Sequence, residues 1–260
     1  MKRKVTDLFD EKKNNSKLKS QNFEYGITVN KSLDKKKVII NAEAITFLGA
    51  KLENRLVEIL ETELVSNFKF HKFKNIFVIG LGNKDVPCDS LGPKVVEKLV
   101  VSRGLDMNPK LCAFAPNVFS NTGIETSEIV GSISNHIKPD LVILIDSLAT
   151  VSVSRLCSCF QISKGGLVAG SGSATNNKKI SSSFLGVKNI VSIGVPMLIY
   201  ANSLNAVDGE GNKLSSFPSL VLSPSDITKS IDLLSDIIAM AINKAVFRNL
   251  CEDEIEALVK

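Results

Sequence analysis

Imidazole side chains are scarce in this sequence, and that scarcity limits its chemistry. Of 260 residues, two are histidines and none is Trp, while aromatic residues make up 6%. A Ser-His-Asp triad needs an imidazole as its base. His71 lies among lysines, and His136 falls at the end of an expected helix, where a cation is favoured. We interpret both as structural or surface residues and expect no such triad.

Long apolar runs and paired cysteines are also lacking. No uninterrupted apolar segment approaches the roughly 20 residues needed to span a bilayer, and the lysine-rich N-terminus has no apolar core of a signal peptide. We therefore expect a cytoplasmic protein without membrane contact. An odd, scattered set of cysteines favours free thiols over a disulfide framework. These are Cys88, Cys112, Cys157, Cys159 and Cys251.

Recognisable cofactor and metal motifs are incomplete. Gly80-Leu-Gly82 begins like a dinucleotide fingerprint, but Asp85 occupies the place of the third glycine. No phosphate-binding GxxxxGK[ST] motif occurs. Cys157 and Cys159 would point to one face of a strand, and they lack the spaced partner pair of a usual zinc site. We expect neither a cofactor nor a metal.

Hydrophobic residues make up 44% of the chain, which is enough to bury one large core. Its charge is uneven: residues 1–40 hold 11 Lys/Arg against 5 Asp/Glu, whereas residues 41–260 hold 21 against 22. We interpret residues 1–22 as a flexible basic tail and residues 23–260 as a single α/β domain. Such a tail could contact nucleic acid or an acidic partner, or it could simply be solvated.

The order of expected elements is typical of an α/β fold. A small hairpin is expected at Tyr25–Val29 and Lys37–Ile40, followed by a helix over Leu48–Phe68. Asn75 to Val101 then gives a strand, a loop and a helix, and strands and helices alternate to the end of the chain. This pattern predicts a mostly parallel sheet with helices on both faces and a small N-terminal hairpin and helix extension. Further strands are expected at Leu111–Ala115, Leu141–Ile145, Cys159–Ile162 and Asn189–Gly194, and a last helix is expected to follow the N-cap Ser223.

Two aspartates are expected at the carboxyl ends of strands, where open α/β folds place their working residues. Asp89 follows the Gly80–Asn83 turn, and Asp146 ends the strand Leu141–Ile145. An aspartate there can be only a cap or an ion-pair partner. Two carboxylates that share one crevice repel each other, so that the pair holds a single proton and can act as base and acid toward water.

Two other segments bear on this site. Thr122 and Glu125 have the spacing of a capping box, which would begin a helix running toward His136. Glu125 is interpreted as a helix cap, a substrate-binding residue or a catalytic residue. The polar stretch Gly165–Lys179 is predicted to be a flexible loop that covers the site.

Several motifs together resemble the germination proteases, the spore endopeptidases that degrade small acid-soluble spore proteins. They occur in family order and cover most of residues 75–250. The matching segments are GLGN with CDSLGP (80–93), TGIETSEIV (122–130), KPDLVILIDSLA (138–149), FQISKGGLVAGSGS (160–173), VSIGVP (191–196) and LSPSDITKSIDLLSDIIAMAINKA (222–245).

The resemblance implies an atypical aspartic-type endopeptidase without metal or cofactor, on a fold similar to that of the hydrogenase-maturation proteases. It implies a homotetramer in the developing spore, with Asp89 and Asp146 as the catalytic pair. It also implies a zymogen that cleaves itself, here near Asp7 and Leu8. Residues that would bind substrate or shape the site are Asn83, Thr122, Glu125, Ser171 and Pro196.

The sequence departs from the family pattern in places. Pro87 and Cys88 precede Asp89 where a threonine is usual, and the segment before the last helix is short. A second hypothesis is therefore a catalytically silent relative that acts as a spore-associated binding or scaffold protein through its basic arm. A third, processing of a metalloenzyme precursor, is disfavoured because neither histidine is near either aspartate in sequence.

Overall fold

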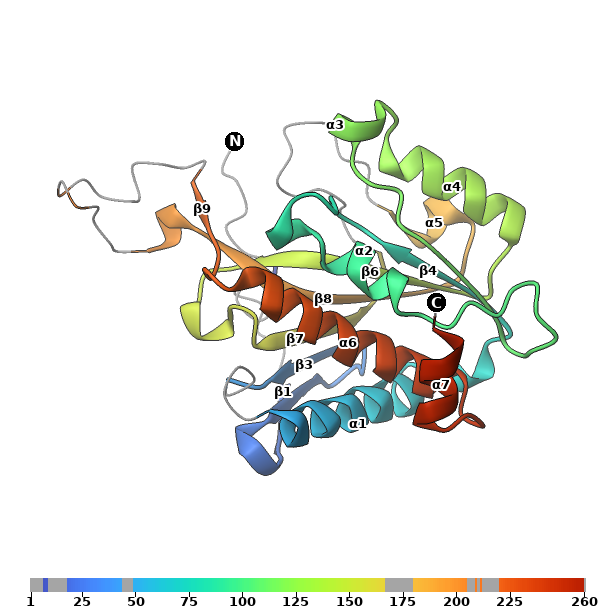
Figure 1. The fold of residues 1–260 in the computed structure, drawn as a ribbon, viewed down its shortest axis with the longest axis horizontal. Coiled ribbons are helices and arrows are strands. Elements are labelled where there is room, and N and C mark those ends of the chain that lie inside the picture. Colours follow the sequence, from blue (N-terminus) through green and yellow to red (C-terminus); the bar gives the residue numbers. More distant parts are fainter. Residues whose placement is uncertain are drawn as a thin grey trace.

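The computed structural model describes residues 7–8, 18–43, 49–166, 180–204, 209, 211 and 220–259. Its centre is a nine-stranded sheet in the order β1-β2-β3-β7-β8-β6-β4-β5, with the short strand β9 paired to β8 (Figure 1). The strands are β1 Leu18–Asn22, β2 Thr28–Ser32, β3 Lys37–Asn41, β4 Asn75–Gly80, β5 Lys110–Phe114, β6 Leu141–Thr150, β7 Cys159–Lys164, β8 Asn189–Tyr200 and β9 Val221–Leu222.

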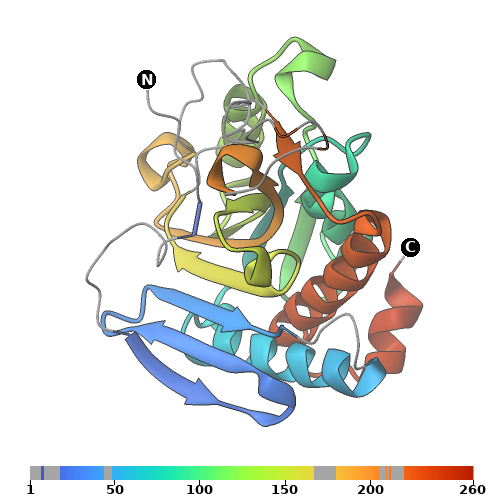
Figure 2. The same cartoon turned by 90° about the vertical axis from the view of Figure 1, so that its left-hand side faces the viewer.

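The α/β class is confirmed, but the sheet is mixed rather than mostly parallel. Strands β8, β6, β4 and β5 run parallel to one another. Strands β1, β2, β3 and β7 pair antiparallel and join the parallel half through β7 and β8. The parallel half needs crossover connections, and the helices that provide them cover it. The antiparallel half is the lower blue and yellow part of Figure 2.

Helices cover both faces of the sheet, as expected. On one face α1, α2 and α6 share a core with the sheet, and on the other α4 and α5 do so. Strand β6 shows why, since alternate side chains point to opposite faces: Ile143 packs in the first core and Leu144 in the second. The helices are α1 Ala50–Ser66, α2 Leu91–Glu97, α3 Phe119–Thr122, α4 Thr126–Ile137, α5 Ser182–Leu185, α6 Ile227–Val246 and α7 Glu252–Leu258.

Short 3-10 helices occupy five of the connections. They are η1 Glu24–Gly26, η2 Phe70–Lys72, η3 Pro87–Asp89, η4 Val153–Arg155 and η5 Ala201–Ser203. Of these, η3 contains Asp89 and contacts both β6 and β8. The loop after β4 is thereby held against the middle of the parallel half.

Four sequence expectations need correction. Leu18–Asn22 was assigned to the flexible tail, but it forms strand β1, paired with β2. Strands β6 and β8 do not end at 145 and 194; they continue to Thr150 and Tyr200 because their apolar residues stay buried. The last helix begins at Ile227 rather than beside Ser223, with Asp226 at its N-cap. Helix α7 was not expected at all.

Candidate active site

Asp89 is held at the end of β4 by close backbone contacts. A Cβ atom on Gly80 would lie 2.2 Å from the carbonyl oxygen of Gly92, so only glycine lets α2 approach the strand this closely. Gly82 has φ +112°, and a Cβ there would lie 2.0 Å from the carbonyl oxygen of Asp89. The backbone N–H of Asn83 donates to Asp89 Oδ2 at 2.8 Å. The turn therefore fixes both the backbone and the side chain of Asp89.

Asp146 lies inside β6, and its backbone is paired with Gly194 of β8. Its side chain is 8% exposed. A Cβ atom on Gly194 would lie 2.7 Å from Leu148, so the glycine leaves room for that side chain beside Asp146. The preceding residue, Ile145, accepts a hydrogen bond from Leu81 N–H at 2.8 Å. The end of β4 is thus joined to the middle of β6, directly before Asp146.

Both carboxyl groups have raised pKa values, and the charge of Asp89 acts on Asp146. Burial raises the pKa of Asp89 to about 6, partly offset by the hydrogen bond from Asn83 N–H. Burial raises the pKa of Asp146 well above its usual range, and the charge of Asp89 raises it further. A like charge at short range disfavours the ionised form. The pair therefore favours a state in which Asp146 holds the proton and Asp89 is ionised near neutral pH.

Asp7 and Leu8 lie beside this pair. Asp7 N–H donates to Ala149 O at 2.9 Å, and Ala149 N–H donates to Asp7 Oδ2 at 3.0 Å. The charge of Asp7 also contributes to the raised pKa of Asp146. Leu8 is fully buried with Ile39 and Leu148. The expected processing region is thus bound against the carboxyl half of β6.

The other predicted site residues differ in where the structure places them relative to the two aspartates. Asn83 is close, through its bond to Asp89, and its Oδ1 accepts from Asp85 N–H at 3.0 Å. Pro196 is buried in β8, opposite Leu148. Proline cannot donate to the ladder, and the register of β6 and β8 shifts directly after this pair. Ser171 lies outside the described residues.

The expected capping box at Thr122 and Glu125 is wrong. Thr122 ends α3, and its hydroxyl bonds locally to Val118 and Ile124. Glu125 is at the N-cap position of α4, but its side chain makes no capping hydrogen bond. A left-handed Gly123 (φ +67°) separates the two short helices. No catalytic role follows from these positions.

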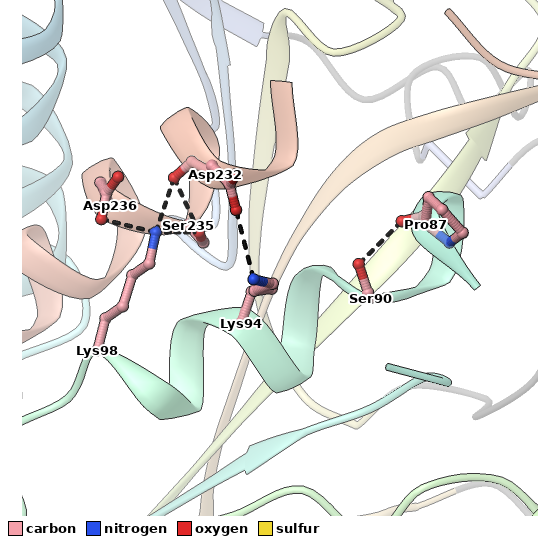
Figure 3. Close-up of polar contacts among 7 residues, drawn as sticks. All are labelled: Pro87, Ser90, Lys94, Lys98, Asp232, Ser235 and Asp236. Atoms are coloured by element: carbon pink, nitrogen blue, oxygen red, sulfur yellow. Dashed lines mark hydrogen bonds and ion pairs between the residues drawn. The ribbon is translucent and has the colours of Figure 1, made fainter. Parts of the chain in front are cut away.

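Helix α2, which follows Asp89, is fastened to α6 by two lysines (Figure 3). Lys98 Nζ donates to Asp232 O at 2.9 Å and Ser235 Oγ at 2.8 Å, and it lies 2.7 Å from Asp236 Oδ1. Lys94 pairs with Asp232 Oδ1 at 3.5 Å. At the start of the helix, Ser90 Oγ donates to Pro87 O at 3.0 Å. These contacts hold α2 and the η3 turn against α6.

Sequence reasoning missed Gly92, Gly194 and Lys98 as residues that position the site. Gly92 stands in the segment Leu91-Gly-Pro93 right after Asp89, and a glycine at the start of a helix is a signal of close approach. Nothing in the sequence marks Lys98, because its partners are more than 130 residues away.

Among the remaining titratable groups, Cys88 adjoins Asp89 in η3, and burial and the charge of Asp89 raise the pKa of its thiol. His71 and His136 are exposed, and the five cysteines are free thiols, with burial raising the pKa of Cys157 to about 12. Within the described part of the chain, no group of three or more potential ligand side chains could hold a metal ion. None of its helices is both long and apolar enough to span a bilayer.

The family model and the two relatives described here are all named germination protease. A family model described as germination protease matches residues 1–208. The germination protease of Clostridium perfringens (strain 13) is 30% identical over 84% of this chain and 80% of its own. That of Caldanaerobacter subterraneus subsp. tengcongensis is 37% identical over 63% of this chain and 53% of its own. The matches thus span from about half to four fifths of these relatives.

Among solved structures, the [NiFe] hydrogenase maturation protease HycI from Thermococcus kodakarensis KOD1 is similar over 71% of this chain and 98% of its own. The two share 20% identity and a TM-score of 0.41. This neighbour is a hydrogenase maturation protease, and the resemblance found in the sequence implies a fold similar to that of this class. A likeness of this extent supports no comparison of sites.

Proposed function

Because the chain belongs to the germination protease family, we propose that it is an endopeptidase that cleaves small acid-soluble spore proteins with Asp89 and Asp146. The observation that carries the proposal is a pair of carboxyl groups with raised pKa values, one in the turn after β4 and one inside the adjoining parallel strand β6. Aspartate pairs that share a proton are suited to activating water.

The different burial of the two side chains suggests their roles. Asp89, with a pKa of about 6, is ionised at neutral pH and takes a proton from water. The resulting hydroxide adds to the scissile carbonyl carbon, while the protonated Asp146 donates its proton to the carbonyl oxygen. When the carbon–nitrogen bond breaks, the proton held by Asp89 passes to the leaving amine. As the tetrahedral carbon collapses, its hydroxyl proton returns to the carboxylate of Asp146, and this restores the protonated form of Asp146.

The test is cleavage of a purified small acid-soluble spore protein, followed by product masses. Asp89→Asn and Asp146→Asn keep the side-chain shape and remove the ionisable group, so each is expected to lower kcat at least 10³-fold by loss of acid–base catalysis. Asp85→Asn is a matched control, since Asp85 is exposed and four residues from Asp89. Undiminished cleavage by either active-site variant would show that the pair is wrongly assigned. No cleavage by folded wild type would favour the silent relative.

The docked N-terminal segment supports a zymogen that processes itself. Asp7 and Leu8 are hydrogen-bonded and packed beside Asp146, so a substrate chain could not take the same place along β6. Incubation of the full chain at mildly acidic pH is expected to produce a shortened protein cut near Asp7 and Leu8, measured by intact mass. Asp146→Asn is the control that should retain Met1. A wild-type chain that keeps Met1 throughout would contradict self-processing.

A further inference from the structure

A row of lysines lies along one edge of the sheet, although residues 41–260 are nearly neutral in total. The strands β8, β6, β4 and β5 begin at this edge, and β7 ends there, because it runs antiparallel to β8. A lysine stands at or next to each of these strand ends and at the β2–β3 turn. We name this set the lysine edge: Lys35, Lys37, Lys74, Lys110, Lys138, Lys164 and Lys188.

Hydrogen bonds to backbone carbonyl groups hold the neighbouring parts of the lysine edge together. Lys110 N–H donates to Lys74 O at 2.7 Å. Asn75 Nδ2 donates to Lys138 O at 3.1 Å, and Asn189 Nδ2 donates to Asp140 O at 3.0 Å. The connections that begin β5, β4, β6 and β8 therefore form one continuous surface. A hollow of about 510 Å³ at its centre is lined by Lys72, Lys74 and Lys188.

The central cations have no carboxylate partners. Among the residues that the structure describes, Lys72, Lys74, Lys138 and Lys188 form no ion pair, and all four are exposed. Asp140 is the acidic residue in the hollow, and its Oδ2 is already engaged by the N–H groups of Lys74 and Asn75 at 3.1 and 3.0 Å. The lysine ammonium groups are thus available for an external anion.

Further cations flank the surface. Desolvation lowers the pKa of His71, and the charges of Arg248, Lys72 and Lys69 lower it further. Arg248, Lys72 and Lys69 are therefore all close enough to His71 for their charges to act on it. In contrast, Lys164 lies over the ring of Phe68, 5.7 Å from its centroid, and Lys110 Nζ donates to Leu105 O. We expect the strongest positive electrostatic potential at the central hollow rather than at the two ends of the lysine edge.

The dimensions of the lysine edge fit a duplex nucleic acid. From β3 to β5 there are five strand spacings, or roughly 24 Å at about 4.8 Å each. A DNA duplex carries roughly 14 phosphate charges over that length, at one per 1.7 Å. The exposed aromatics Tyr25, Phe114 and Phe119 lie at or beyond the opposite strand ends. Nearer to the edge, Phe184 packs over Gly131 of α4, and Phe73, which lines the hollow, packs against the core. Single strands are usually bound by stacking their bases on aromatic rings, so the edge suits paired strands better.

We propose that the lysine edge binds the phosphate backbone of double-stranded DNA without sequence preference. Asp89 and Asp146 lie at the other ends of the same strands, so a bound duplex leaves the candidate active site open. This surface is distinct from the basic N-terminal tail. It extends beyond the proposed peptidase function and does not depend on it.

The test is binding of a fluorescent 20-base-pair duplex of mixed sequence to the full chain across a salt series. The triple variant Lys74→Gln/Lys138→Gln/Lys188→Gln is expected to bind roughly tenfold or more weakly at low salt. Its plot of log affinity against log salt should be shallower by roughly 2 to 3 units, since each phosphate contact contributes about 0.9. Circular dichroism checks that the variant is folded.

Matched variants separate this surface from other charges. Lys51→Gln/Lys84→Gln/Lys229→Gln removes three exposed lysines away from the lysine edge and should leave the slope within one unit. Lys2→Gln/Arg3→Gln/Lys4→Gln tests the tail. The proposal is overturned if the lysine-edge variant binds like wild type, or if the tail variant accounts for all of the loss. Competition by poly-L-glutamate as effective as by duplex, at equal charge, would overturn the assignment to nucleic acid.

Discussion

The two ends of the parallel strands carry opposite charges in opposite settings. At the carboxyl end, Asp146 is buried and Asp89 is half-buried, and close glycine contacts and backbone hydrogen bonds fix their places. At the amino end, Lys74, Lys138 and Lys188 are exposed and have no ion-pair partner among the described residues. A buried charge is destabilising unless it is compensated, whereas an exposed one is solvated. The carboxyl end should therefore be sensitive to single substitutions, and the amino end tolerant of them.

The most damaging change should be Gly92→Ala. The added methyl group would lie 2.3 Å from the carbonyl oxygen of Leu81 and 2.5 Å from its nitrogen. Since backbone atoms must move apart, we expect a loss of roughly 3 kcal/mol in the free energy of unfolding and a displaced Asp89. A misplacement of about 1 Å can lower the rate about 10²-fold. Urea unfolding and peptide cleavage measure the two effects.

Gly209→Ala is the matched control for that substitution. Nothing lies within 4 Å of a Cβ atom at this position, and its φ is not in the left-handed range. Its effect should stay within about 0.5 kcal/mol. Equal stability of the two variants would mean that the close contact between α2 and β4 does not constrain the site.

The next effect is a pH-dependent gain of stability in Asp89→Asn. The folded-state pKa of Asp89 is raised to about 6 from 3.8, so folding favours the protonated form. Its contribution is fully present below pH 3.8 and is lost as the pH rises through 6. Asparagine cannot ionise and still accepts the hydrogen bond from Asn83. At pH 8 the variant should therefore be more stable than wild type by roughly 1 to 3 kcal/mol.

Thermal unfolding of wild type and Asp89→Asn at pH 4 and pH 8 measures this difference. The gain should be present at pH 8 and small at pH 4, where the wild-type carboxyl group is mostly protonated. Asp146→Asn should follow the same direction, since burial also raises the pKa of Asp146. A loss of stability at pH 8 in both variants would contradict the account of two costly buried charges.

The two lysines that fasten α2 to α6 also differ in what they contact. Lys98 makes three polar contacts with α6 and is one quarter exposed, whereas Lys94 makes one at 3.5 Å and is 41% exposed. Lys98→Met should cost roughly 1 to 2 kcal/mol, because the hydroxyl of buried Ser235 and the carbonyl of Asp232 lose this donor. Lys94→Met should cost below about 1 kcal/mol. Urea unfolding compares them, and the reverse order would show that α2 is held by packing alone.

The sequence predicted the carboxyl end of the strands better than the amino end. The uniformly apolar Leu141–Ile145 marks a strand covered on both faces, and the position of Asp146 follows from it. Asp89 follows from the glycine turn after β4. Both signals are local, so a single segment carries each. The family resemblance rested on the same segments, and the germination protease model confirms it.

The lysine edge could not be predicted from a local sequence signal. Its residues come from six connections spread between Lys35 and Lys188, and residues 41–260 balance 21 cations against 22 anions. A near-zero total hides charges that the topology separates, and only the strand order brings these lysines together. The continuation of β6 and β8 was missed for a related reason: the segments past Asp146 and Gly194 are ordered by pairing with each other and with β9.

The smallest effect on stability is expected at the amino end. Lys138→Gln/Lys188→Gln removes two exposed charges that have no ion-pair partner among the described residues, so no buried group loses a contact. Neighbouring like charges repel each other, and their removal should leave the unfolding free energy within about 0.5 kcal/mol of wild type or raise it slightly. Urea unfolding in low salt measures this change. A clear destabilisation would mean that these lysines serve the fold, and the contrast between a constrained carboxyl end and a free amino end would then fail. An unchanged stability joined to weakened duplex binding would instead separate the lysine edge from the folding of the chain.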